Sequence, residues 1–526
     1  QSIVCLYSML FVMFFYFLFN GNNSVRWSYY FIVFNILLIA KLIENKEQFN
    51  LHILLLSGFV FILFLGILSY VSIEYNFTTE INVNQIKKNF IILSICVILS
   101  VISFMKVRRL KYFLALSLIV EAVYCFYSRS INGDQAIIAD QASAKLYIDK
   151  MYDTEAIDIL KENDTDFYRI DYASNDSLAY NYPMIKNYMG FSSYISIYNF
   201  ETRPLIDDRI SDSWFIGYTP SKFLLKSLLG SKYLIVDRSE EMWIPYGYNK
   251  YIDLENQVIY RNKLDNSLGF ASSDLLPIKD NIRLDKSLEE MIFMNYIVCE
   301  DCQVNSFQDA GKNMDVQILG ENIINSSVKV PKEKGYVFVD YSNTIPFSTI
   351  TADFYKNGDL VKNIYREEFG YTVFDSDEQY DEIYFYVQNY YNKNEYVPAN
   401  IYWVSEFELD TWYNNLQNKP HFYDIDLNGS TISAKINVKE RNTIGLTTIP
   451  YNPGWSVKVN GKKRNILRVN DAMIGFELSE GENEITMQFI PYGIKLGILI
   501  SGISMIILGY FIYINIYSKK SKIKKD

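Results

Sequence analysis

The chain has 526 residues, a formal net charge of -10 and 21% charged side chains. Its length exceeds one ordinary domain, and its acidic balance argues against a nucleic-acid partner, because no broad basic surface is available to displace counterions from phosphates. A mean hydropathy of -0.01 averages very apolar segments with a polar remainder, so we expect a membrane part and an exposed part.

Five apolar runs open the chain, and each is near or above the length that a membrane-spanning helix requires. They cover residues 3–19, 27–43, 51–73, 90–105 and 110–127. We therefore expect residues 1–128 to form a membrane region with five spans. Glu121 would lie inside the last of these spans, where a proton or substrate role competes with pairing to a polar neighbour. Because Gln1 already stands in an apolar run, we expect the chain to be a fragment of a longer protein.

A long polar segment follows, and its composition changes near residue 310. In residues 129–310, helical patterns such as 221–229 alternate with short strand-like runs such as 232–236, which predicts a mixed α/β domain. Gly230 stands where a cap of the helix at 221–229 is expected.

Residues 311–492 consist mainly of short strand-like runs separated by turn residues, which predicts a β-sandwich of jelly-roll type. Near its end, Trp455 begins an alternation of apolar and polar residues, and Asn460 with Gly461 supplies the positive-φ pair of a tight hairpin. Trp455 stands on the apolar side of this alternation, so we expect it in the core.

The chain closes with a predicted transmembrane helix over residues 493–514 and a basic tail over residues 515–526. Five lysines in the tail place the C-terminus in the cytoplasm under the positive-inside bias, and this puts residues 129–492 outside. The predicted fold class is therefore a polytopic α-helical membrane protein with about six spans and a large extracytoplasmic α/β plus β-sandwich region.

Cys299 and Cys302 form a CxxC pair in the predicted outer region. A zinc site would need two more ligands, of which His421 is the one other soft candidate there, so we expect no metal. In redox catalysis the two cysteines would stand at the start of a helix, but this pair follows a predicted helix over 287–298. A passive thiol pair or a structural bridge is the remaining interpretation, with a strained local disulfide as one form. The sequence also holds no Gly-rich phosphate loop, nucleophile elbow or HExxH motif.

Four segments in a fixed order carry a family resemblance. They are NDSLAYNYPMIKNYMGFSSYISIYN (175–199), FLLKSLLGSKYLIV (223–236), IPYNPGWSVKVNGKK (449–463) and EGENEITMQFIPYGIKLGILIS (480–501). With a final span directly after them, the chain resembles the C-terminal half of the YfhO-like bacterial membrane proteins. That family is similar in architecture to the GT-C glycosyltransferases, and its members are implicated in adding sugars to wall polymers such as lipoteichoic acid.

The resemblance implies a membrane glycosyltransferase, or its C-terminal half, with the lipid bilayer, a polyprenyl-phosphate-linked sugar and a wall-polymer acceptor as partners. It also implies a multi-pass protein of a bacterial plasma membrane. Its catalytic acid would lie in a first outer loop that this chain lacks, so no catalytic residue can be named here. A divalent metal could assist, but its ligands would not lie in this chain. Candidate substrate contacts, each of which could instead support a turn or the core, are Asn181, Tyr188, Ser192, Ser193, Tyr194 and Tyr451.

Two other function classes compete with sugar transfer. A non-catalytic protein of the cell envelope, anchored in the membrane, could use the same outer region to bind a carbohydrate or a partner. A transporter is disfavoured, because the predicted spans hold almost no charge.

Overall fold

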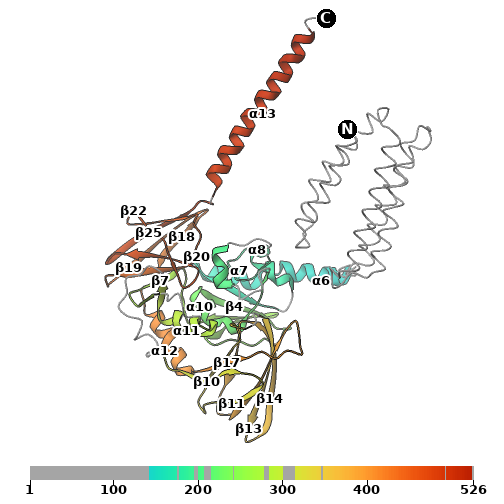
Figure 1. The fold of residues 1–526 in the computed structure, drawn as a ribbon, viewed down its shortest axis with the longest axis vertical. Coiled ribbons are helices and arrows are strands. Elements are labelled where there is room, and N and C mark those ends of the chain that lie inside the picture. The colour runs from blue at the N-terminus through green and yellow to red at the C-terminus, as the bar shows by residue number, and fades with distance from the viewer. Residues whose placement is uncertain are drawn as a thin grey trace, which may run out of the picture. The chain divides into compact units, whose positions relative to one another are not determined.

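The computed structural model describes residues 141–523, with gaps at 175–176, 195–199, 207–214, 241, 278–283, 300–313, 345–346 and 492 (Figure 1). The chain divides into two units, Gln1–Ser143 and Ala144–Asp526, and the description below concerns the second. The five predicted spans before residue 128, Glu121 within them, and Cys302 lie outside the described residues.

The predicted fold class is wrong for the part of the chain that the structure describes. Instead of a polytopic helical protein with about six spans, this part is mostly β-strand and contains one helix long and apolar enough to cross a membrane. That segment is Ile494–Ile514, within α13 (Ile494–Ile523). The next longest helices described have 12 residues, about 18 Å, which is too short for a hydrocarbon core of about 30 Å. Elsewhere the apolar residues lie on strands and short helices, and they build the cores between the sheets.

The first sheet has the order β1-β4-β6-β5. Its strands are β1 (Arg169–Ala173), β4 (Ser231–Asp237), β6 (Gln257–Asn262) and β5 (Tyr248–Asp253). β1 and β4 run parallel, and the other two pairs are antiparallel. Helix α7 (Glu155–Asn163) buries Ile157 and Leu160 against one face of this sheet.

The helix predicted over 221–229 is present and ends at the predicted glycine. It begins as the 3₁₀ turn η5 (Pro220–Lys222) and continues as α10 (Phe223–Leu228). Gly230 has φ +82, and a Cβ there would lie 2.5 Å from the Ser267 carbonyl oxygen, so glycine is needed for both reasons.

Two four-stranded antiparallel sheets face each other between residues 316 and 405. One has the order β10-β17-β12-β15, and the other has the order β11-β16-β13-β14. The strands are β10 (Val316–Ile323), β11 (Ser326–Lys329), β12 (Gly335–Asp340), β13 (Phe347–Lys356), β14 (Asp359–Phe369), β15 (Tyr371–Ser376), β16 (Glu382–Asn389) and β17 (Ala399–Ser405). Taken as eight strands in chain order, this is the pairing of a jelly roll. Buried Val337, Phe374 and Trp403 of one sheet pack with Ile350, Phe354 and Phe385 of the other.

Two further sheets lie at the C-terminal side and share a core that includes Ile436, Phe476 and Met487. The five-stranded sheet has the order β18-β19-β25-β21-β22, and the six-stranded sheet has the order β7-β20-β24-β23-β9-β8. Their strands are β7 (Gly269–Ser272), β8 (Leu275–Pro277), β9 (Ile297–Cys299), β18 (Tyr423–Asn428), β19 (Thr431–Val438), β20 (Thr443–Pro450), β21 (Trp455–Val459), β22 (Lys462–Arg464), β23 (Leu467–Val469), β24 (Met473–Leu478) and β25 (Gly481–Phe489).

The predicted domain division near residue 310 stays a prediction, but strands from both sides of it share one sheet. β7 pairs with β20, and β9 pairs with β23. Helices α11 (Lys286–Asn295) and α12 (Glu406–Gln417) contact each other beside these sheets. The predicted hairpin is confirmed, because β21 and β22 meet at Asn460 and Gly461, whose φ values are +52 and +74. Trp455 is half-buried and packs on this core, with its ring 5.1 Å from that of Phe489.

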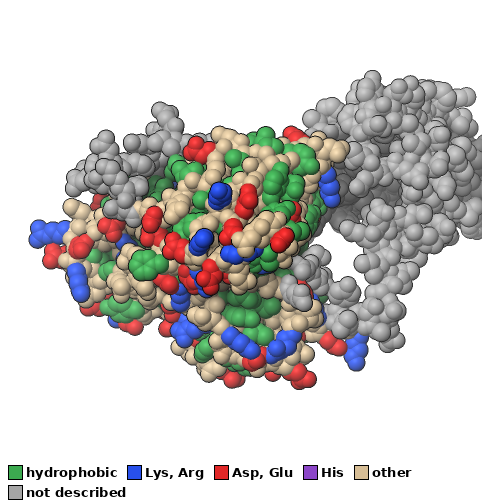
Figure 2. Space-filling model, turned by 90° about the horizontal axis from the view of Figure 1, so that it is seen from below, with side chains coloured by type: hydrophobic (Ala, Val, Ile, Leu, Met, Phe, Trp, Pro, Cys, Tyr) green, Lys and Arg blue, Asp and Glu red, His purple; other side chains and the backbone are tan. Residues whose placement is uncertain are grey.

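A buried polar network joins the α/β sheet region to the jelly roll. Ser221 Oγ donates to Glu368 Oε1 over 2.7 Å, and the ammonium of Lys222 donates to the carbonyl of Tyr371. Lys222 and Ser221 are fully buried, so these contacts fix η5 against β14 and β15. The face seen in Figure 2 carries acidic and basic side chains intermingled, without an extended basic field among the described residues.

Candidate functional site

The carboxyl ends of β1 and β4 meet at one edge of the first sheet, because the two strands are parallel. In open α/β sheets this is the edge where ligands bind. Ser174 follows β1, and Asp237 ends β4. We name the polar group gathered here the β1–β4 edge cluster. It consists of Lys150, Tyr172, Ser174, Lys186, Asp237, Glu240 and Gln257.

Asp237 is the centre of this cluster. Its Oδ1 accepts hydrogen bonds from Tyr172 Oη over 2.7 Å and from Gln257 Nε2 over 3.0 Å. Its Oδ2 lies 3.3 Å from Lys150 Nζ. The Asp237 carboxylate is buried, and its contacts with two hydrogen-bond donors and one cation hold it in one orientation.

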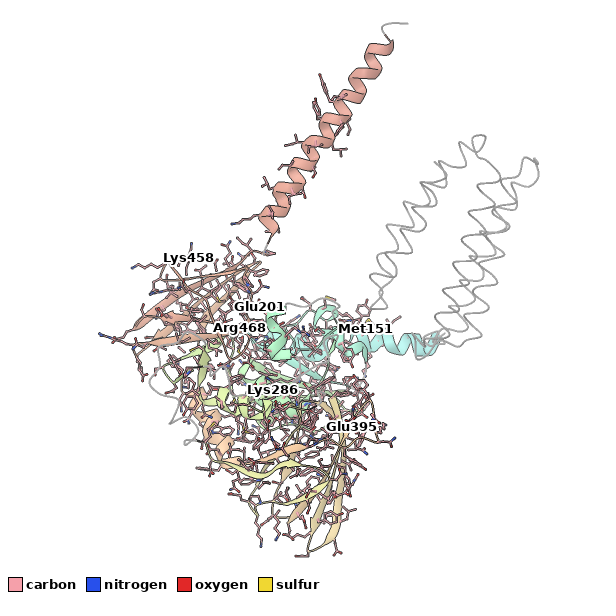
Figure 3. The ribbon with its side chains drawn as sticks, viewed as in Figure 1. Met151, Glu201, Lys286, Glu395, Lys458 and Arg468 are labelled. Carbon is pink, nitrogen blue, oxygen red and sulfur yellow. The ribbon has the colours of Figure 1, made fainter. Side chains whose placement is uncertain are left out.

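Lys150 links two carboxylates at the end of α6 (Gln141–Tyr152), next to Met151 (Figure 3). Its Nζ lies 3.2 Å from Glu240 Oε1, which also accepts a hydrogen bond from Ser174 Oγ over 3.0 Å. Partial burial lowers the pKa of Lys150, but attraction to Asp237 and Glu240 outweighs this effect and raises the pKa. Lys150 is therefore a fixed positive charge at neutral pH.

Lys186 is a buried ammonium with no hydrogen-bond partner in the described structure. The residue is 3% exposed, and its Nζ lies 4.1 Å from the ring centroid of Tyr182 and 5.0 Å from that of Tyr172. Burial lowers the pKa of Lys186, and the charges of Asp153 and Asp237 offset only part of this effect. An ammonium has three donors, so an anionic or hydroxyl-bearing ligand would satisfy a group that the protein leaves unbonded.

The structure joins two of the six predicted contact residues by a hydrogen bond. Asn181 Oδ1 accepts a hydrogen bond from the backbone N–H of Tyr194 over 3.3 Å. Burial raises the pKa of the Tyr188 hydroxyl, with Asp171 adding to the effect and buried Ser192 opposing it.

Ser193 and Tyr194 form the short strand β2 (Ser193–Tyr194), which pairs with β3 (Phe215–Ile216). Tyr194 is 52% exposed, so its ring is available for stacking. Tyr451 lies apart from these residues, directly after β20, and packs on the core of the C-terminal sheets. No described contact makes the six residues one site.

Lys186 and Asp237, the two central residues of the cluster, were not identified from the sequence, although both lie in or next to the family-like segments. Lys186 stands inside the family-like segment 175–199, and Asp237 directly follows the family-like segment 223–236. Two segments that carry the family resemblance therefore converge on one edge of the sheet. Periodicity could not reveal this, because the convergence depends on the parallel pairing of β1 with β4, about 60 residues apart in sequence.

The remaining candidates for chemistry are structural. Cys299, the last residue of β9, is disulfide-bonded and fully buried in the core. His421 Nε2 lies 3.0 Å from the Leu416 carbonyl oxygen. Burial lowers the pKa of His421. Glu201 at the 3₁₀ turn η4 (Phe200–Thr202) pairs with Arg468 of β23 over 3.3 Å (Figure 3). This pair ties the segment after β2 to the six-stranded sheet.

Known proteins resemble this chain to different degrees. The family model described as "Bacterial membrane protein YfhO" matches residues 2–501. The "Uncharacterized protein YfhO" of Bacillus subtilis (strain 168) is 23% identical over 430 residues, which cover 75% of this chain and 49% of that protein. The chain therefore spans about half the length of this curated relative.

Two cryo-EM structures of the arabinofuranosyltransferase AftD from Mycobacteria also match. The first, a mutant, is 11% identical and covers 31% of this chain and 12% of its own, with a TM-score of 0.13. The second is 10% identical and covers 49% of this chain and 29% of its own, with a TM-score of 0.12. TM-scores this low do not show a shared fold. The match to the family model over residues 2–501 does show the family: the chain belongs to the YfhO family of bacterial membrane proteins.

Proposed function

We propose that this chain is part of a membrane glycosyltransferase that moves a sugar from a polyprenyl-phosphate donor to a wall polymer, such as lipoteichoic acid, outside the membrane. Membership of the family supports a role at the membrane. The observation that carries the proposal is the β1–β4 edge cluster, where two family-like segments converge around the buried, unbonded ammonium of Lys186 and the oriented carboxylate of Asp237.

The chemistry of such a cluster suits a sugar or phosphate ligand. Lys186 and Lys150 would attract a phosphate oxygen, and the carboxylates of Asp237 and Glu240 would accept hydrogen bonds from sugar hydroxyls. Outside the plasma membrane there is no pool of nucleotide sugars, so the leaving group of the donor would be a lipid phosphate. The catalytic acid of this reaction is not assigned to any residue of this chain.

The proposed location places the residues between β1 and β25 on the outer side of the membrane and the basic tail in the cytoplasm. The lysines after residue 518 support this orientation through the positive-inside bias. The disulfide at Cys299 supports it as well, because disulfides persist mainly in oxidising compartments.

A second candidate function is carbohydrate or partner binding without transfer. One observation favours it: the two carboxylates of the cluster are both already paired with Lys150, at 3.3 Å and 3.2 Å. A carboxylate held by a cation is a poor base for deprotonating an acceptor hydroxyl, because the cation stabilises its ionised form.

Deletion of the gene, followed by sugar analysis of purified wall polymers, tests the proposal. We expect the polymer to lose sugar in the deletion strain and in strains carrying Lys186→Met or Asp237→Asn at wild-type protein levels. Lys435→Met is the matched control, because Lys435 is an exposed lysine that pairs with Asp424, and its strand β19 belongs to the five-stranded sheet at the C-terminal side and not to the first sheet. Unchanged sugar content after deletion would overturn transfer, whereas loss in the deletion strain alone would overturn the role of the cluster.

A further inference from the structure

One face of the jelly roll is rich in tyrosine and points away from the core. Along β16, Ile383, Phe385 and Val387 are buried, so Tyr384 and Tyr386 lie on the opposite side. Along β13, β14 and β16 the same alternation turns a further set of residues outward. We name the whole set the tyrosine face; it consists of Thr351, Asp353, Tyr355, Asn363, Tyr365, Glu367, Glu382, Tyr384, Tyr386 and Gln388.

Strand register places these side chains in rows across the sheet. Tyr386 and Tyr365 flank Thr351 from the two neighbouring strands, and Tyr384 and Asn363 flank Asp353 in the next row. The rings of Tyr384 and Tyr386 are 4.5 Å apart, and their planes meet at 38°. Neighbouring outward rows are therefore lined by aromatic rings with polar groups between them.

The hydroxyl groups on this face share one electrostatic environment. Desolvation raises the pKa of Tyr386, and Asp353, Tyr384, Tyr355 and Tyr396 add to the shift in that order. Tyr396 is 44% exposed and lies in the connection from β16 to β17, beside Glu395 (Figure 3). This connection extends the face beyond the strands, because Tyr396 forms a bridge with Gln388.

The charge on the face is acidic. Asp353, Glu367 and Glu382 lie outward on three different strands, while Lys329 stands across from Glu382 at the β11 edge. The Glu367 carboxylate accepts a hydrogen bond from Tyr365, and the Asp353 carboxylate accepts one from Asn363. The face thus offers carboxylate acceptors close to ring faces.

We propose that the tyrosine face binds a neutral glycan chain. The C–H faces of sugar rings stack on tyrosine rings, and sugar hydroxyls donate to carboxylates and exchange hydrogen bonds with amides. The rows suit a linear chain, because successive rings along β16 are close enough to contact neighbouring sugars. This binding goes beyond the proposed sugar transfer and does not require it.

The negative charge of the tyrosine face favours a neutral glycan over a polyanion or a lipid surface. A polyanion such as an unsubstituted glycerol phosphate chain would be repelled by three carboxylates. A lipid surface would require many basic and apolar groups. This face instead carries three carboxylates, and its exposed apolar residues Leu360 and Val361 lie at the start of β14. An uncharged, hydroxyl-rich ligand fits both the rings and the acids.

Affinity electrophoresis of the full chain in mild detergent tests the inference. The gels contain a neutral glucan, galactan or mannan in turn, and a parallel gel contains poly(glycerol phosphate) without sugar substituents. We expect at least one neutral polysaccharide to slow the wild-type protein, and the Tyr384→Ala/Tyr386→Ala variant to bind it about tenfold more weakly or worse. Tyr423→Ala is the matched control, since Tyr423 is 41% exposed on β18, outside the jelly roll, and its variant keeps full binding.

Hydrogen exchange of peptides from β13 and β16 shows whether the double variant keeps its fold. If it does not, Asp353→Asn takes its place, and we expect weaker binding from the loss of a charged acceptor. Absence of binding to all three neutral polysaccharides, equal binding by variant and wild type, or tighter binding of poly(glycerol phosphate) overturns the inference. Glycan binding in a protein whose deletion leaves wall sugars unchanged would retain the tyrosine face and remove the transfer function.

Discussion

Two buried lysines beside the first sheet lead to different predictions for stability. Lys226 Nζ lies 2.6 Å from Asp171 Oδ2, and the two side chains are 3% and 5% exposed. Lys226→Met would leave the Asp171 carboxylate buried without its cation, which costs about 3–5 kcal/mol when one partner of a buried pair is removed. Local opening of β1 and β4 should then become at least about a hundredfold more frequent.

Lys186 differs because no group among the described residues accepts a hydrogen bond from its ammonium. Lys186→Met removes the cost of burying this charge and keeps a similar volume, while it gives up a ring contact with Tyr182 worth about 0.5–2 kcal/mol. The two effects nearly cancel, so we expect a change within about 1 kcal/mol.

Hydrogen exchange measured on peptides from β1 and β4 distinguishes the two lysines. We expect faster exchange in Lys226→Met and nearly unchanged exchange in Lys186→Met. A similar loss of protection in both variants would show that Lys186 is paired within the fold. It would refute the reasoning that assigns Lys186 to a ligand.

Three further predictions concern the packing between sheets. Gly269→Ala should disrupt the pairing of β7 with β20, because the φ of Gly269 is +135 and a Cβ there would lie 2.1 Å from the Leu446 carbonyl oxygen. In urea unfolding we expect the free energy of unfolding to fall by more than about 3 kcal/mol. Burial lowers the pKa of Lys222 to about 8 despite the attraction of Glu368, whereas the ordinary pKa of lysine is 10.5. Between these two pH values the unfolded chain binds more protons than the folded chain. Stability should therefore rise with pH across that window by up to roughly 3 kcal/mol. Lys222→Met should abolish this rise in the urea midpoint, and an unchanged pH profile would contradict it. Ser221→Ala should cost about 1–3 kcal/mol and weaken protection in β15, because Glu368 loses its donor; a neutral effect would show that water replaces the hydroxyl.

The features that could be predicted from the sequence are local. Asn460 and Gly461 form a hairpin because both residues tolerate positive φ, and the closing helix beginning at Ile494 was visible as an uninterrupted apolar run. Gly230 likewise ends its helix in the left-handed conformation. Each of these signals involves neighbours in the chain, so no tertiary information is needed.

The features that could not be predicted depend on distant partners. The pairing of β7 with β20 joins residues about 175 positions apart, and nothing in either strand specifies the other. The burial of Lys186 is similarly invisible, because a lysine in a polar segment is ordinarily exposed. The fold class was wrong for the described residues because apolar runs are easy to see, whereas a core built from short alternating strands leaves a weaker pattern.

Protease treatment of intact protoplasts tests the account most directly, because donor, acceptor and function all depend on which side the β-rich region faces. The protein would carry an epitope tag after Asp526, and immunoblots would follow the tag and the region between β1 and β25. We predict that the β-rich region is cut while the tag stays protected. Cleavage of the tag with an intact β-rich region would contradict the proposed orientation and, with it, sugar transfer at the outer surface.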